Sequence, residues 1–185
     1  MDENELDNAL DAILRRVQSA ENVWAAFQRE CASYHARSAT TLADMRARDD
    51  KKKHGDLWEL FCLRYLQAHL LVRAAWLLKH APAAVLQALS LGRADMGIDI
   101  IAVDAAGSYW AVQCKWRAPD NKRRTYISWA QLSTFYALVA RTGSYSKQLV
   151  CTNAAGARRV GVPSPGDETH GSAQFAQLSR TRGSA

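Results

Sequence analysis

The sequence predicts an α/β fold in which a helix is followed by three strands, a second helix and a further strand. Two β-rich runs, residues 98–103 and 109–116, flank a short turn that contains Gly107, and this arrangement predicts a β-hairpin. An apolar run over residues 57–66 precedes the hairpin and predicts a helix, whereas the later run 148–152 predicts another strand. These elements are expected to build one central mixed sheet with helices packed against it.

The N-terminal part of the chain predicts a separate helical segment. Leucine, isoleucine and valine recur at helical spacing within residues 4–36, and a stretch rich in Ser, Thr and charged residues follows. We therefore place a boundary near residue 50, between an N-terminal helical segment (1–50) and a main domain (51–161). Residues 162–185 are rich in Pro, Gly and Ser, so we expect a flexible C-terminal tail there.

Several residues indicate where the elements of the main domain begin and end. Asp56 is suited to cap a helix that begins near Gly55, and Pro82 suits the first turn of a short helix that follows a short strand. Residues 76–78 predict that strand. After the hairpin and a basic loop, Ser128 is suited to cap the second long helix, which is expected to end near Arg141.

Composition limits the classes of protein to which the chain could belong. The formal net charge is +6 with a pI near 9.3, and positive charge gathers at residues 51–54 and 115–124, which favours a polyanionic partner. No apolar run reaches the roughly 18 residues of a membrane span, and the acidic N-terminus lacks the features of a secretory signal. The four cysteines form no CxxC pair, so an intracellular, reducing location is expected.

A group of polar residues in the predicted hairpin indicates a chemical role. Side chains alternate along a strand, so Gln113 and Lys115 share one face and the apolar residues between and beside them face the core. Asp99 lies between isoleucines in the neighbouring run, and the hairpin brings it toward the Gln113 end. Polar side chains in apolar strands are costly without a partner, which indicates a shared site.

The residue types in this group suit metal-assisted hydrolysis of a phosphodiester. Asp99 supplies an anionic oxygen for Mg²⁺, to which the amide oxygen of Gln113 and the backbone carbonyl of Cys114 can add. Glu59, on the preceding helix, can join the metal directly or through water. Lys115 can orient the attacking water or stabilise charge that builds up on phosphorus.

Two motifs extend this interpretation to a family. Gly97-Ile98-Asp99, followed after thirteen residues by Gln113-Cys114-Lys115, resembles the GxD…QxK signature of Mrr-like nucleases in the PD-(D/E)xK superfamily. Residues 55–59 resemble that family's first-helix motif, whose glutamate matches Glu59. Residues 127–136 and 151–153 are similar to nuclease domains fused ahead of helicases in viral and restriction-type proteins. The resemblance covers roughly residues 51–161.

The resemblance implies a restriction-endonuclease-like αβββαβ core and a DNA endonuclease that depends on Mg²⁺, with Mn²⁺ able to substitute. It also implies DNA as substrate and a helicase domain or subunit as partner. A dimer is one alternative for the oligomeric state. One departure is that Gln113 stands where the superfamily more commonly has an acid, so the metal site loses one charge. That loss leaves metal number and affinity open.

Other residues are candidates for DNA contact. We expect phosphate contacts in the basic loop from Lys122, Arg123 and Arg124, because the loop follows Lys115 directly. Further phosphate contacts are assigned to Gln131 and Ser133, although an ordinary place on the helix surface is an equal alternative for both.

Less specific interpretations stand beside these roles. Asp99 could form an ion pair with Arg93 or Arg117, Glu59 could be a solvated helix residue, and the lysines at 51–53 could be a solvated charge run. For the whole domain, the rival is a non-catalytic DNA-binding module of a helicase assembly, which the missing acid at Gln113 favours. Resolution or repair of branched DNA uses the same chemistry and is a third alternative.

Overall fold

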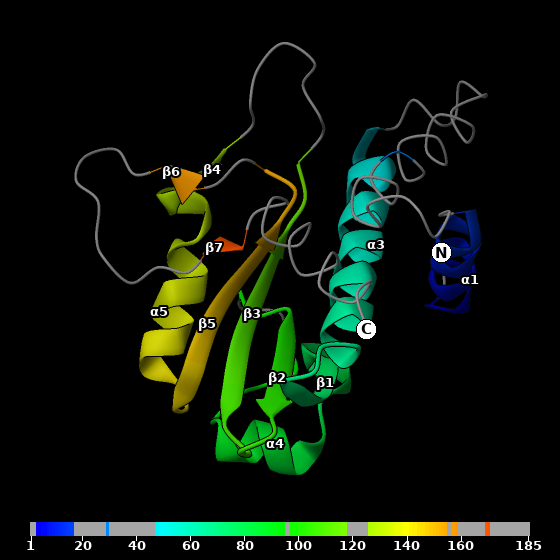
Figure 1. Cartoon of the computed structure of the whole chain (residues 1–185). Helices are drawn as coiled ribbons and strands as arrows, with labels where there is room; N and C mark the ends of the chain where they lie inside the picture. The colour runs from blue at the N-terminus through cyan, green and yellow to red at the C-terminus, as the bar shows by residue number, and fades with distance from the viewer. Residues whose placement is uncertain are drawn as a thin grey trace, which may run out of the picture.

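The fold is built on a five-stranded mixed sheet, which confirms the predicted α/β class. The computed structural model describes residues 3–16, 29, 47–94, 97–117, 126–154, 157–158 and 169–170. Within that part of the chain the strand order is β1-β2-β3-β5-β7. β1 (Val72–Leu77), β2 (Ile100–Asp104) and β3 (Tyr109–Lys115) are antiparallel neighbours, whereas β5 (Tyr145–Thr152) runs parallel to β3. Figure 1 shows the sheet between its helices.

The β2–β3 hairpin forms as predicted. Ile100 pairs with Val112 and Val103 with Tyr109, so β2 lies beside the first four residues of β3. Gly107 takes a positive φ of 85° in the connecting turn, a conformation that costs glycine little. β2 begins at Ile100, two residues later than the predicted strand, and Asp99 therefore lies just before it.

One face of the sheet is covered by α3 (Ala47–Gln67). Trp58 and Cys62 of this helix are buried against Val112 and Cys114 of β3, and α1 (Glu3–Arg16) packs on the same core. The predicted helix start at Gly55 is wrong, because α3 begins eight residues earlier. Lysine is a good helix former, so the basic run continues the helix toward its N-terminus.

The other face is covered by α5 (Ser133–Arg141) and α4 (Ala83–Ala88), so α3 and α5 lie on opposite sides of the sheet (Figure 1). Gly97 packs directly on α5: a Cβ built there would lie 2.9 Å from the backbone nitrogen of Phe135, and its φ is 105°. A side chain at residue 97 would push the approach to Asp99 away from the helix.

Element boundaries depart from the expected ones in two further places. The predicted helix after Ser128 begins as a 3-10 turn, η2 (Trp129–Gln131), before α5. The strand predicted at residues 76–78 is β1, which starts at Val72 and gives way at Leu78 to the 3-10 turn η1 (Leu78–His80).

Short elements complete the described structure. β4 (Ile127–Ser128) and β6 (Ala157–Arg158) pair in parallel as a separate two-stranded sheet. β7 (Thr169–His170) adds to the main sheet beside β5; these are the only described residues of the segment 162–185. The predicted continuation of the N-terminal helix to residue 36 lies outside the described residues, Arg29 apart. No helix within the described ranges is long and apolar enough to span a membrane.

Candidate active site

Asp99 is fixed by its backbone between β3 and η1, just before β2 begins. Its N–H donates to the carbonyl of Val112 at 2.9 Å, and its own carbonyl accepts from the N–H of Leu78 at 2.8 Å. Residues on β3 and η1 therefore hold Asp99 from two sides. The position is 8% exposed, so the side chain sits in a largely dry environment.

The carboxylate of Asp99 is satisfied by groups on β3. Its Oδ2 accepts hydrogen bonds from the side-chain amide of Gln113 and from the backbone N–H of Cys114, the latter at 2.5 Å. Gln113 is 2% exposed. A buried carboxylate needs such donors, because burying it without a partner costs on the order of several kcal/mol. The structure thus brings Asp99 and Gln113 together, as the hairpin predicted.

Glu59 reaches the same place from the opposite face of the sheet. It lies half-buried on α3 and lines, with Asp99, a pocket of about 260 Å³. Two cationic residues, Lys79 and Arg93, complete the polar lining of this pocket. The helix glutamate and the hairpin aspartate, far apart in sequence, are therefore neighbours around one cavity.

Arg93 is held by the backbone near this cavity and not by Asp99. Its Nη1 donates to the carbonyl of Lys79 at 2.8 Å, and it makes no ion pair with the described acids. The N–H of Arg117 donates to the side chain of Asn153 at 2.7 Å, and the amide of Asn153 donates back to the Arg117 carbonyl at 2.6 Å. Within the described part of the chain, the alternative of an Asp99 ion pair with Arg93 or Arg117 is not observed.

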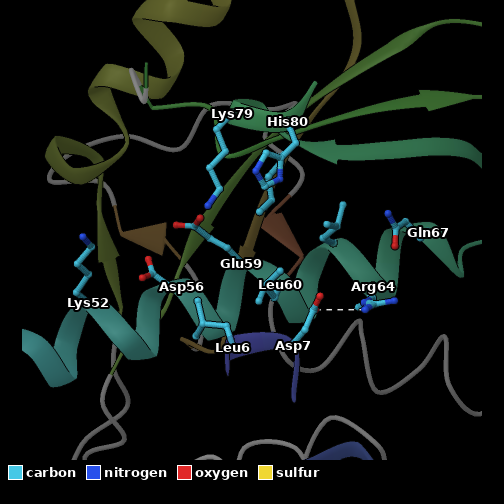
Figure 2. A pocket seen from close by; sticks show the side chains of 12 residues that line it. Leu6, Asp7, Lys52, Asp56, Glu59, Leu60, Arg64, Gln67, Lys79 and His80 are labelled. Atoms are coloured by element: carbon cyan, nitrogen blue, oxygen red, sulfur yellow. Dashed lines mark hydrogen bonds and ion pairs between the residues drawn. The ribbon is translucent and has the colours of Figure 1, made fainter. Parts of the chain in front are cut away.

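A larger hollow of about 700 Å³ opens next to the Asp99 pocket. The two cavities share Glu59, Leu77 and Lys79. Figure 2 shows Lys79 extending toward the carboxylate of Glu59, with Asp56 one helical turn away on α3. Glu59 thus lies on the wall that the two cavities share, beside the cationic Lys79.

Lys115 closes β3 and is half-buried. It lies two residues after Gln113, so both side chains project from the same face of the strand. Lys115 pairs with Thr152 of the parallel strand β5 and is not among the residues that line the Asp99 pocket. Its direct contact with the reacting groups remains a prediction.

Of the residues assigned to DNA contact, only Gln131 and Ser133 lie in the described part of the chain. Lys122, Arg123 and Arg124 lie outside the described residues. Gln131 and Ser133 are exposed, but both make local bonds at the start of α5: the Gln131 side-chain oxygen accepts the Ser128 N–H at 3.0 Å, and the Ser133 hydroxyl donates to the Ala130 carbonyl at 2.8 Å. Both side chains are thus held locally by the chain, and their contact with phosphate stays a prediction.

The donor set can be tested against a divalent cation. Asp99, Glu59 and the amide of Gln113 offer hard oxygen donors of the kind that Mg²⁺ binds. Among the described residues, no group of three or more His, Cys, Asp or Glu side chains is arranged to hold a metal. The set therefore fits Mg²⁺ only with an amide or backbone oxygen as an additional ligand, which is consistent with glutamine at position 113.

Three buried thiols lie behind the site, on the α3 side of the sheet. Cys62, Cys114 and Cys151 belong to one apolar core cluster, and none of the three forms a disulfide. Burial raises the pKa of the Cys62 and Cys114 thiols well above the ordinary value. Neutral thiols are poor nucleophiles, so these residues serve packing.

The sequence motifs missed Lys79 and Arg93. Neither residue is part of a motif with a recognisable spacing. The chain has 24 lysines and arginines, so residue type alone does not single these two out. Only their place on the pocket wall distinguishes them.

Comparison with known proteins identifies the family. The model of the Mrr-type restriction endonuclease family matches residues 67–158. This part of the chain is a restriction endonuclease domain. The match contains Asp99, Gln113 and Lys115 but begins at the last residue of α3, so Glu59 lies outside it.

Other comparisons add little to this assignment. A search among curated proteins found no match. One solved structure that the chain resembles is described as an ATP-dependent Type ISP restriction-modification enzyme LlaBIII bound to DNA. It is 18% identical, with a TM-score of 0.37, and the likeness covers 61% of this chain and 8% of that chain. The restriction endonuclease domain described here thus corresponds to a small part of that enzyme's length.

Proposed function

We propose that the restriction endonuclease domain is a Mg²⁺-dependent DNA endonuclease that hydrolyses phosphodiester bonds at Asp99. One observation carries the proposal: the buried Asp99 carboxylate touches Gln113 and shares a cavity with Glu59. Carboxylates gathered in a recess at the end of a sheet are expensive unless they serve a cation or a reaction. The family match, which contains Asp99 and Gln113 but not Glu59, supports a nuclease.

Each residue has a role that its position supports. Asp99 and Glu59 would hold the metal, and Gln113 would present its amide oxygen after a half-turn about its last side-chain bond, since the two ends of an amide are alike in size. The N–H of Cys114 points toward Asp99. In a strand, the N–H and C=O of one residue point the same way, so the Cys114 carbonyl is directed to that side too. A bound Mg²⁺ would lower the pKa of water and neutralise phosphate charge.

Lys115 is proposed to act on the reacting water or phosphate from the end of β3. An ammonium group near the phosphorus stabilises the negative charge that builds up as the new bond forms. In this role Lys115 serves as an electrostatic and hydrogen-bonding group. Fusion to a helicase domain belongs to the same proposal.

The decisive experiment uses supercoiled plasmid DNA. Purified protein is incubated with Mg²⁺, with Mn²⁺ or with chelator, and nicked and linear products are measured on a gel. Cleavage that needs either metal supports the proposed nuclease. Binding to DNA without cleavage in any metal supports the rival, a non-catalytic DNA-binding module, for which the uncharged Gln113 at the metal position is the favouring observation.

A further inference from the structure

The pocket at Asp99 has a cationic wall that the proposed metal site does not use. Lys79 lies on η1 and Arg93 on the loop that leads toward Asp99, and both line the pocket. The Arg93 guanidinium is anchored to the Lys79 carbonyl at 2.8 Å. This bond fixes the Arg93 guanidinium relative to the backbone of Lys79.

The anchoring bond leaves most of the guanidinium available. An arginine side chain has five N–H donors in a planar fork, and this bond uses one of them. To the described residues, Arg93 makes no other hydrogen bond or ion pair. A planar group with several open donors beside a recess is suited to phosphate oxygens, which arginine binds in pairs.

The charge of the pocket points to the same ligand. Its lining holds two carboxylates, Asp99 and Glu59, and two cations, Lys79 and Arg93, so the formal sum is zero. A divalent cation bound by the carboxylates would raise the sum to +2. The pocket would then attract a phosphate diester most strongly when it is loaded for reaction.

We propose that Lys79 and Arg93 bind the phosphate backbone of the DNA at the mouth of the Asp99 pocket. The inference rests on the proposed function and adds to it a second line of DNA contact, on the η1 side of the site. Figure 2 shows Lys79 extending over Glu59, and both residues line the two adjoining cavities.

The test measures binding of duplex DNA in chelator, where no cleavage occurs, as a function of salt concentration. Lys79→Gln, Arg93→Gln and their combination are compared with wild type. Each lost phosphate contact lowers the log–log salt slope by roughly 0.9. Arg73→Gln is the matched control, since Arg73 is exposed on β1 and lines neither cavity. It removes the same charge and should leave the slope unchanged.

Stability and a conservative variant separate binding from a structural role. Arg93→Lys keeps the charge and should keep most of the slope, and thermal unfolding shows whether each variant is folded. If Lys79 only balances Glu59 and Arg93 only anchors the loop, unfolding midpoints fall while the slope of the folded protein stays at the wild-type value. That result overturns the inference, as does an equal loss of slope in Arg73→Gln.

The outcome is independent of catalysis. If the salt slope of DNA binding falls in the Lys79 and Arg93 variants but the wild type cuts DNA with neither Mg²⁺ nor Mn²⁺, the result supports the phosphate contacts and contradicts the proposed nuclease activity. If the wild type cleaves DNA and the salt slope is unchanged in both variants, only the proposed phosphate contacts are overturned. Failure of the wild type to bind duplex DNA overturns both.

Discussion

Gln113 donates a hydrogen bond from its side-chain amide to the buried carboxylate of Asp99. The two side chains lie on neighbouring segments of one hairpin, and Gln113 is 2% exposed. A second carboxylate at position 113 would repel Asp99 whenever no cation lies between them. Glutamine therefore stabilises the site in the absence of metal, at the cost of one charge when metal is bound.

Asp99→Asn is expected to abolish cleavage and to preserve DNA binding. Asparagine is nearly isosteric, and its oxygen can still accept the Cys114 N–H, but it is a neutral and weaker ligand for Mg²⁺. The rate of plasmid cleavage should fall by several orders of magnitude, at about 1.4 kcal/mol for each factor of ten. Binding in chelator should persist, because it depends on Lys and Arg contacts. Equal cutting by variant and wild type would place the activity elsewhere.

Gln113→Glu should make the free energy of unfolding depend on metal. Without metal, two buried carboxylates face each other, and an uncompensated buried charge costs on the order of 3 kcal/mol. The unfolding midpoint in chelator should therefore drop, by roughly 2–4 °C for each kcal/mol in a chain of this size. Added Mg²⁺ should raise the midpoint of the variant more than that of wild type, because the folded state alone holds the site.

Gln131→Glu is the matched control for that experiment, since Gln131 is exposed and lies on η2. The same substitution there should leave the response to metal at the wild-type level. A Gln113→Glu midpoint that moves no more with Mg²⁺ than wild type does would contradict the assignment of position 113 to the metal site.

Replacing Lys122, Arg123 and Arg124 together with alanine should weaken DNA binding and flatten its salt dependence. The loop follows Lys115 directly, and each lost phosphate contact removes roughly 0.9 from the log–log slope. Fluorescence anisotropy with a labelled duplex at several salt concentrations measures this slope. A triple variant with the wild-type slope would show that DNA lies on another surface.

Asp104 should contribute stability that is lost in acid. Hydrogen bonds from the Ser108 N–H at 2.8 Å, the Trp110 ring nitrogen at 3.2 Å and the Ala106 N–H at 3.0 Å lower the pKa of Asp104 below its ordinary value of 3.8. A lowered folded-state pKa stabilises the protein above the unfolded value and ceases to do so as pH falls through the folded value. Asp104→Asn should therefore lower the unfolding midpoint near neutral pH.

The difference between Asp104→Asn and wild type should shrink as the pH falls below about 4, the region in which the wild-type carboxylate is also neutralised. Asp11→Asn, an exposed position on α1, is the control and should show no such trend. A difference in midpoint that stays constant from neutral pH into acid would contradict the role of the Asp104 charge in the hairpin turn.

The sequence by itself determined the hairpin and the polar face on it. Alternation in β3 places Gln113 and Lys115 on one face, and the Gly107 turn sets the register that brings Asp99 to Gln113. These relationships span few residues, and local periodicity and turn chemistry encode them. The same local signals gave the wrong start for α3, because a capping residue can also lie inside a helix that continues through it.

The motif resemblance assigns Glu59 to the site, but only the tertiary structure decided how it and two cationic residues come to surround Asp99. Glu59 lies 40 positions before it on a helix that covers the opposite face of the sheet, and Lys79 and Arg93 come from a 3-10 turn and a loop. Their convergence depends on how α3 packs against β1 and β3, through the buried contacts of Trp58 and Cys62. The spacing of apolar residues along the sequence does not predict such packing, because it depends on the shapes of side chains that meet only after the chain has folded.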